Sequence, residues 1–170
     1  MTFPRFSYQT SRLQINEILN SNQNPDFLAS VMQILTPRVV ENLPPYFHNV
    51  DSTLSAQEWL KQIMSEGRLF IVQLTGENKT IGFVFLSTEN RGDTHIGYLL
   101  AESYWGKGYA TEILKGLIDF IDSENKITRL IAGVATDNIT STKLLHKLGF
   151  MQNSSEDKGT IFFEYQLSQT

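Results

Sequence analysis

Two glycines stand directly before a strongly amphipathic stretch in the segment "YWGKGYATEILKGLIDFI", residues 104–121, and this constrains the fold more than any other feature of the chain. The apolar residues of the stretch recur with the period of a helix: Ile113, Leu114, Leu117, Ile118 and Ile121. The first turn of a helix has amides without internal partners and the positive end of the macrodipole, so it attracts anions. Gly106 and Gly108 allow positive φ angles and close backbone approach, so the segment predicts an anion-binding loop, with phosphate as the usual guest.

The spacing within this loop argues against two common phosphate sites. A P-loop reads G-x-x-x-x-G-K-[ST], but Lys107 lies between the glycines, so no hydroxyl is placed for magnesium. A dinucleotide fingerprint needs a third small residue where Thr111 stands. It also needs a strand that opens a βαβ unit, whereas the strand before this loop belongs to a series of hairpins.

Strand and helix patterns alternate along the rest of the chain. Apolar runs bounded by turn residues predict strands at about 8–18, 68–74, 80–86, 94–101, 128–136 and 160–167. Helical periods predict helices at about 25–35, 55–66, 109–123 and within 138–150. The three strands between 68 and 101 are expected to form an antiparallel meander, and the strand at 128–136 to be buried on both faces. These elements predict one α/β domain over residues 1–170, with a mixed sheet and helices on its faces.

Three further segments have recognisable local patterns. Ser55 and Glu58 have the spacing of a capping box at the start of the second helix, and Gly67 ends that helix. Prolines at 37, 44 and 45 predict irregular backbone over residues 36–50. A polar loop is expected over residues 153–159.

Composition excludes several classes of function. The chain has 170 residues, 41% of them hydrophobic, which is enough for one substantial core. Its formal net charge is −4 and its Lys and Arg are not clustered, so no nucleic acid partner is expected. The absence of Cys excludes disulfides and catalytic thiolates. No signal peptide or apolar run of membrane-spanning length is recognisable, so we expect a cytoplasmic protein without a membrane partner.

The loop "WGKGYA" resembles the pyrophosphate loop of the GNAT superfamily of acetyl-CoA-dependent N-acetyltransferases, whose pattern is Q/R-x-x-G-x-G/A. Gly108 and Ala110 match that pattern, and Trp105 stands where Gln or Arg is usual. The longer segment "IGYLLAESYWGKGYATE" is similar to the RimJ/RimL-like branch, the ribosomal-protein-alanine acetyltransferase type. Segments "QTSRLQI", "FIVQLTGENKTIGFVFL" and "VATDNITSTKLLHKLGFM" resemble other parts of that branch in the same order. The resemblance implies a GNAT fold, with a mixed, mostly antiparallel sheet of about six to seven strands flanked by about four helices.

The resemblance also implies how acetyl-CoA is bound, without a metal. The pyrophosphate is expected at the loop and first helical turn, made of Trp105, Gly106, Lys107, Gly108, Tyr109, Ala110 and Thr111. Main-chain amides around Leu99, Leu100 and Ala101 are expected to bind the pantetheine and the acetyl oxygen, and in particular those near Leu99 and Ala101. Asn138 is expected to contact the pantetheine arm. The irregular segment 36–53, with Trp59, Tyr46 and Phe47, matches the region that covers the acceptor site.

The late helix is expected to supply the acid that protonates the departing thiolate. Ser141 lies on the same helical stripe as Leu144, Leu145 and Leu148, where a leucine would be the ordinary inward residue. Leu145 stands near the position of the tyrosine that many family members use, so the resemblance assigns the role to Ser141. Helix capping by Asn138 with back-bonding by Ser141 is the structural alternative.

The amine must lose a proton before it attacks, and His95 is the candidate base because many family members have a glutamate there. Strand alternation places His95 on the same face as Gly97 and Leu99. Glu89, Glu102, His48 and a water relay are alternatives. Gly97 itself indicates either a bulge or close backbone approach, or an ordinary packing glycine.

The expected function is transfer of acetyl from acetyl-CoA to a primary amine by direct attack in a ternary complex. The acceptor is a protein N-terminal residue or a small-molecule amine, and the protein is a monomer or homodimer. A non-catalytic acyl-CoA-binding or sensing module is the alternative, because the usual acid and base have both changed. Turnover on a panel of amines separates the two hypotheses.

Overall fold

A sheet of eight strands organises the computed structural model, which describes residues 7–88, 92–122, 127–157 and 159–167. The strands are β1 Ser7–Gln9, β2 Leu13–Ile18, β3 Arg68–Leu74, β4 Thr80–Thr88, β5 Asp93–Leu100, β6 Arg129–Ala135, β7 Met151–Asp157 and β8 Thr160–Gln166. Their order is β1-β2-β3-β4-β5-β6-β8-β7, and only β5 and β6 pair in parallel. The prediction of a mixed, mostly antiparallel sheet is confirmed, although six to seven strands was an underestimate.

Two edge elements explain the larger number of strands. The expected first strand is divided into β1 and β2, which form a tight hairpin. The predicted polar loop at 153–159 falls mostly within β7, which pairs antiparallel with β8 and has a register shift between Gln152 and Glu156. Because an edge strand needs a neighbour on one side only and can expose polar side chains, its sequence lacks the apolar pattern of an inner strand.

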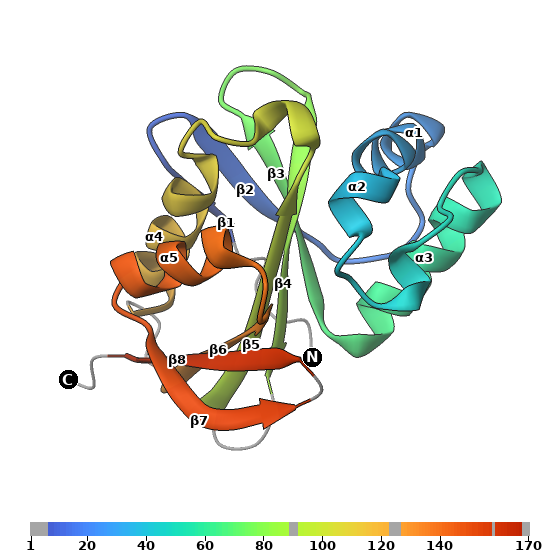
Figure 1. Cartoon of the computed structure of the whole chain (residues 1–170). Coiled ribbons are helices and arrows are strands. Elements are labelled where there is room, and N and C mark those ends of the chain that lie inside the picture. The colour runs from blue at the N-terminus through green and yellow to red at the C-terminus, as the bar shows by residue number, and fades with distance from the viewer. Residues whose placement is uncertain (1–6, 89–91, 123–126, 158, 168–170) are drawn as a thin grey trace.

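Helices cover both faces of the sheet (Figure 1). On one side lie α1 Pro25–Ile34, α2 Pro37–Val40 and α3 Thr53–Glu66, with the 3₁₀ helix η1 Pro45–Phe47. On the other side lie α4 Tyr109–Asp122 and α5 Ile139–Lys147, and the 3₁₀ helix η3 Glu102–Tyr104 precedes the glycine loop. The described residues thus contain five α-helices where about four were expected, because α2 lies in the segment predicted to be irregular.

The capping box of α3 begins one turn earlier than predicted. Ser52, not Ser55, is the N-cap: its hydroxyl accepts the Ser55 amide at 3.0 Å, and the Ser55 hydroxyl accepts the Ser52 amide at 2.9 Å. Serine at the fourth position thus does the work expected of Glu58. Gly67 ends the helix as predicted.

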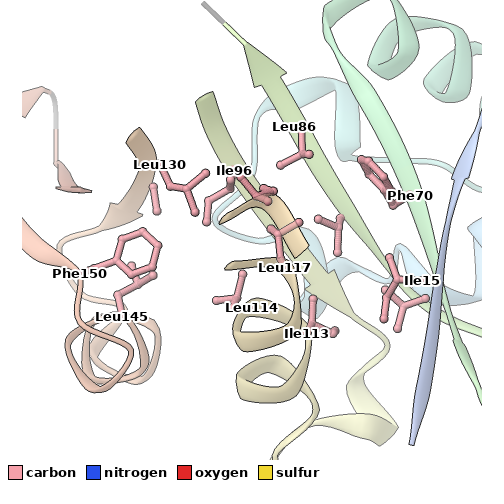
Figure 2. Close-up of a cluster of buried hydrophobic side chains, with 14 of the residues drawn as sticks. Ile15, Phe70, Leu86, Ile96, Ile113, Leu114, Leu117, Leu130, Leu145 and Phe150 are labelled. Carbon is pink, nitrogen blue, oxygen red and sulfur yellow. The ribbon is translucent and has the colours of Figure 1, made fainter. Parts of the chain in front are cut away.

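Each face of the sheet has its own hydrophobic core. Figure 2 shows the core between the sheet and helices α4 and α5, where Ile113, Leu114 and Leu117 of α4 point toward the strands. On the opposite face Trp59, Phe83 and Leu99 belong to a second core with α1 and α3. The strand β6 is not buried on both faces as expected, because its buried residues alternate: Leu130, Ala132 and Val134.

The parallel strands β5 and β6 part before they end. They pair only over Asp93–Ile96 and Arg129–Ala132, although both strands continue for several residues beyond this point. The paired end is fastened by Arg129, whose guanidinium binds Asp93 at 2.6 Å and Glu164 at 3.3 Å. The diverging ends lead into the glycine loop and the start of α5, so the fold places an opening between these two elements.

None of the helices in the described residues is long and apolar enough to cross a membrane. No group of three or more His, Cys, Asp or Glu side chains in the same residues is placed to hold a metal ion.

Candidate functional site

A cavity of about 590 Å³ lies where β5 and β6 diverge. Toward α5 it is lined by Tyr98, Gly133, Val134, Asn138, Ser141 and Leu145. Toward α3 it is lined by Tyr46, Phe47, Glu66, Phe85, Ser87 and His95. Side chains from both faces of the sheet therefore border one continuous space.

The glycine loop next to this opening has the backbone that the sequence predicts. Gly106 has a φ of 70° and Gly108 a φ of 83°, both in the left-handed region that favours glycine. Helix α4 begins at Tyr109, and the Glu112 amide makes an early helical bond to the Gly108 carbonyl at 3.1 Å. The amides of Tyr109, Ala110 and Thr111 come before that point, so they lack the helical partners of later residues and are available to an anion.

An ion pair from the β1–β2 turn fixes the loop and the first turn of α4. Arg12 binds Glu112 through its Nε at 2.7 Å and its amide at 3.0 Å, and its Nη1 donates to the Lys107 carbonyl at 3.1 Å. The Thr10 hydroxyl also binds Glu112, and the Arg12 guanidinium lies 4.2 Å from the ring centroid of Tyr109. Partial burial opposes ionisation of Glu112, but the hydrogen bonds from Thr10 and Arg12 outweigh it and lower the pKa of this carboxyl.

Trp105 attaches the loop to the end of β5. Its indole Nε1 donates to the Leu100 carbonyl at 2.9 Å, and the Arg38 guanidinium lies 5.7 Å from its ring centroid. Arg38 also binds Glu102 at 2.9 Å. The side chain at the usual Gln or Arg position thus bonds to the protein backbone. Glu102, one of the alternative bases, is exposed and does not line the cavity.

The backbone amides of β5 that face the opening between β5 and β6 belong to its even-numbered residues. Ala101 donates its N–H to the Ile81 carbonyl at 2.8 Å, so the prediction that this amide serves the cofactor is wrong. Leu99, paired with Phe83, directs its backbone groups to the same side as Ala101, toward β4. The Thr128 amide bonds to the Gly92 carbonyl at 3.1 Å, which shows that even-numbered residues face β6. Where β6 departs, Tyr98 and Leu100 therefore point their amides into the opening.

The residues predicted around the base lie on the α3 side of the cavity. His95 is half-buried, pairs with Ser87 and lines the cavity, as alternation predicts. Gly97 pairs regularly with Phe85, so the bulge interpretation is wrong; a Cβ on Gly97 would meet the Phe85 ring at 3.4 Å, an ordinary contact, and Gly97 lines the cavity. The His48 ring nitrogen Nε2 lies 2.9 Å from the Leu43 carbonyl and away from the cavity lining. Glu89 lies outside the described residues.

The start of α5 presents a hydroxyl to the cavity. Asn138 caps the helix by accepting the Ser141 amide at 3.1 Å, and back-bonding to Asn138 comes from Thr142, also at 3.1 Å, not from Ser141. The Ser141 hydroxyl instead lies 3.4 Å from the phenol of Tyr98. Burial raises the pKa of Tyr98 more than the hydrogen bond with Ser141 lowers it. Tyr98 was not singled out by the sequence analysis. It is the one hydroxyl residue within "IGYLL", and strand alternation places its side chain on the opposite face of the sheet from His95.

The opposite end of the cavity combines aromatic rings with a carboxylate. The Tyr46 hydroxyl donates to Glu66 at 2.7 Å, and Gln62 donates to the same carboxylate at 2.8 Å. Burial and the bond to Glu66 both raise the pKa of Tyr46. Tyr46 and Phe47 lie with ring centroids 4.8 Å apart, whereas Trp59 is a core residue behind them with 2% exposure. The segment predicted to cover an acceptor thus does border the cavity.

Comparison with known proteins defines the class of this chain. A family profile described as an acetyltransferase (GNAT) domain matches residues 18–151. The uncharacterized N-acetyltransferase p20 of Bacillus licheniformis is 31% identical over 137 residues, which cover 75% of this chain and 76% of that protein. The uncharacterized N-acetyltransferase YjdG of Bacillus subtilis is 32% identical over 124 residues, which cover 69% of this chain and 68% of that protein. The chain therefore belongs to the GNAT family and is an N-acetyltransferase.

Solved structures show the same fold at low sequence identity. A GNAT-family acetyltransferase from Bacillus anthracis superposes with a TM-score of 0.77 at 19% identity, over 95% of this chain and 98% of that one. RimL, a ribosomal L7/L12 alpha-N-protein acetyltransferase solved with coenzyme A, superposes with a TM-score of 0.74 at 14% identity. The match covers 93% of this chain and 96% of RimL. The microcin C7 self-immunity acetyltransferase MccE, solved with acetyl-CoA and AMP, superposes with a TM-score of 0.73 at 14% identity. The match covers 92% of this chain and 93% of MccE. The prediction of a GNAT fold is confirmed, and two of these structural neighbours were solved with coenzyme A or acetyl-CoA.

Proposed function

We propose that the whole chain works as one domain that transfers acetyl from acetyl-CoA to a primary amine by direct attack in a ternary complex. One observation carries this proposal: the cavity at the divergence of β5 and β6 is bordered from both faces of the sheet. A thioester entering from the α4–α5 side and an amine entering from the α3 side meet in that space. Direct attack then needs no acyl-enzyme, which suits a chain without Cys.

The residues around the opening fit acetyl-CoA. The amides of the loop and first helical turn, from Gly106 to Thr111, are placed to bind the pyrophosphate, with Trp105 holding the loop to β5. The amides of Tyr98 and Leu100 are placed for the pantetheine and for polarising the acetyl oxygen. Asn138 uses its side-chain oxygen as helix cap, which leaves its NH₂ group for the pantetheine arm.

Two side chains on opposite sides of the cavity are placed for the proton transfers. His95 accepts the proton that the amine loses, directly or through water. Ser141 donates its hydroxyl proton to the leaving sulfur and recovers a proton from water. Their separation by the sheet keeps the base on the amine side and the acid on the thiol side.

The acceptor we propose is the N-terminal residue of a protein or peptide, as in the RimJ/RimL-like branch, and the reaction takes place in the cytoplasm. Support comes from the structural likeness to RimL and to a ribosomal-protein-S5-alanine acetyltransferase from Vibrio fischeri, with a TM-score of 0.68. Glu66, at the acceptor end, favours a cationic substrate. A small amine is the competing acceptor. An acyl-CoA sensor is a second candidate because Leu145, the next inward residue of α5 after Ser141, is aliphatic and offers no proton.

The test is release of CoA thiol from acetyl-CoA with a panel of amines, comprising peptides with N-terminal Ser or Ala, a polyamine and free amino acids. Ser141→Ala should lower kcat more than it changes acetyl-CoA affinity. His95→Gln should lower kcat/KM most at low pH, where less amine is already deprotonated. Controls are Ser65→Ala and His146→Gln, which change exposed residues outside the cavity. Tight acetyl-CoA binding without turnover on any amine would favour the sensor.

A further inference from the structure

Two hydroxyls from different elements meet on the α5 side of the cavity. The Tyr98 phenol comes from β5 and the Ser141 hydroxyl from the first turn of α5, and their oxygens are 3.4 Å apart. Hydroxyl pairs that bond strongly lie about 2.7–2.8 Å apart, so this contact leaves both groups able to bond a third atom. In the described part of the chain, neither hydroxyl has another protein partner. Both residues line the cavity.

Two features of this pair suit it to donate hydrogen bonds to an atom placed between the two oxygens. Burial raises the pKa of Tyr98, so its phenol keeps its proton at neutral pH and acts as a donor. Ser141 is the third residue of α5, a nine-residue helix, so the positive end of the helix dipole points at the same place. The next inward residue of α5, Leu145, is aliphatic and buried, so it offers no proton.

Thr142, the other hydroxyl residue beside Ser141, is not available for this purpose. Its hydroxyl donates to the Asn138 carbonyl at 3.1 Å and belongs to the helix cap. Tyr98 is therefore the second donor that the fold brings to this point. It reaches the cavity because β5 directs even-numbered side chains, such as Ile96 and Tyr98, toward the α4–α5 core.

We infer that Tyr98 and Ser141 together form a two-hydroxyl site for the CoA sulfur, an inference that rests on the proposed acetyl transfer. As the amine nitrogen bonds to the acetyl carbon, the carbon–sulfur bond breaks and its electron pair goes to sulfur. The sulfur accepts the Ser141 proton while the Tyr98 hydroxyl donates a hydrogen bond to it. The Ser141 oxygen then recovers a proton from water, which balances the proton that the amine lost through His95.

The experiment uses CoA alone and needs no acceptor. The ultraviolet absorbance of the thiolate, followed against pH, gives the ionisation of bound CoA in the wild type, in Tyr98→Phe, in Ser141→Ala and in the double variant. Tyr98→Phe should lower the acid dissociation constant of the bound CoA thiol about tenfold, because the thiolate loses a hydrogen bond. Ser141→Ala should act in the same direction. The double variant should lose more than the product of the two, because both donors share one sulfur atom and the remaining donor partly compensates each single loss.

Matched measurements separate this effect from general damage. Tyr165→Phe removes a phenol oxygen outside the cavity and should leave the bound thiol unchanged. Desulfo-CoA has no sulfur, so all variants should bind it as the wild type does in calorimetric titration. With an active acceptor, Tyr98→Phe should lower kcat about tenfold while KM for acetyl-CoA stays within twofold.

Different results would contradict the two-hydroxyl site and the proposed acetyl transfer. A folded Tyr98→Phe protein that binds CoA and shows the wild-type thiol titration would overturn the two-hydroxyl site and leave acetyl transfer standing. If Tyr98→Phe does not fold, an unchanged thiol titration in Ser141→Ala would overturn it equally. A folded wild type that binds no CoA would instead remove the proposed function itself.

Discussion

Replacing Glu112 by Gln removes the charge that joins the β1–β2 turn to the start of α4, and we expect it to destabilise the protein by about 2 kcal/mol. The carboxylate accepts hydrogen bonds from Thr10, from the Arg12 amide at 3.0 Å and from Arg12 Nε at 2.7 Å. Hydrogen bonds to charged groups contribute roughly 1.5–3 kcal/mol each. The Arg12 side chain is 43% exposed, so solvent screening reduces the total to about one such bond. For a chain of this length, the loss corresponds to a fall in Tm of about 4–8 °C.

The pH dependence of this difference follows from the lowered pKa of Glu112. A carboxyl whose pKa is lower in the folded state stabilises the fold above its unfolded pKa of about 4.3. That stabilisation is lost as the pH falls through the folded value. Wild type and Glu112→Gln should therefore differ most at neutral pH and converge in acid.

Thermal unfolding followed by circular dichroism, at pH 7 and at a series of lower pH values, measures both effects. Asp119→Asn is the matched control, because it removes the same charge from an exposed position on α4 and should change stability by less than about 0.5 kcal/mol. Equal Tm values for the two variants at pH 7 would refute the ion-pair account. So would a deficit in Glu112→Gln that stays constant through the acid range.

Three further substitutions probe the loop, the acceptor side and the core. Trp105→Phe loses the indole bond to the Leu100 carbonyl and should raise the Kd for acetyl-CoA about fivefold in calorimetric titration; an unchanged Kd would mean that this bond does not position the loop. Tyr46→Phe loses the bond to Glu66, so steady-state kinetics should show a higher acceptor KM with an unchanged acetyl-CoA Kd, and the reverse pattern would place Tyr46 on the cofactor side. Leu145→Ala should cost about 2–5 kcal/mol in urea unfolding because the side chain is 1% exposed, and a loss below 1 kcal/mol would contradict its core role.

The features that sequence predicts best are those set by neighbouring residues. The hairpins of β3, β4 and β5 follow from alternation and turn residues, and Gly106 and Gly108 have the positive φ angles that their place before α4 requires. Predictions from local sequence are wrong where the same residues allow two local structures, as at the start of α3. Ser52 and Ser55 formed the capping box in place of Ser55 and Glu58, because serine can accept an amide at either position.

Features that depend on distant residues could not be predicted in this way. Arg12 and Glu112 are 100 residues apart, and Tyr98 and Ser141 are 43 apart, so no periodicity connects them. The direction of the β5 amides depends on which neighbour pairs with each edge of that strand. For this reason the prediction for Ala101 was wrong, and the amides that face the opening belong to Tyr98 and Leu100.

The most direct test of the account is calorimetric titration of acetyl-CoA into the wild type, Gly108→Ala and Gly76→Ala. Both glycines have a φ of 83°, so alanine meets the same backbone strain at either position, but Gly76 lies in the turn between β3 and β4. We predict similar losses of thermal stability in the two variants, with acetyl-CoA affinity reduced at least tenfold in Gly108→Ala alone. Equal affinity in all three proteins, or no binding to the folded wild type, would contradict the assignment of this loop to the pyrophosphate.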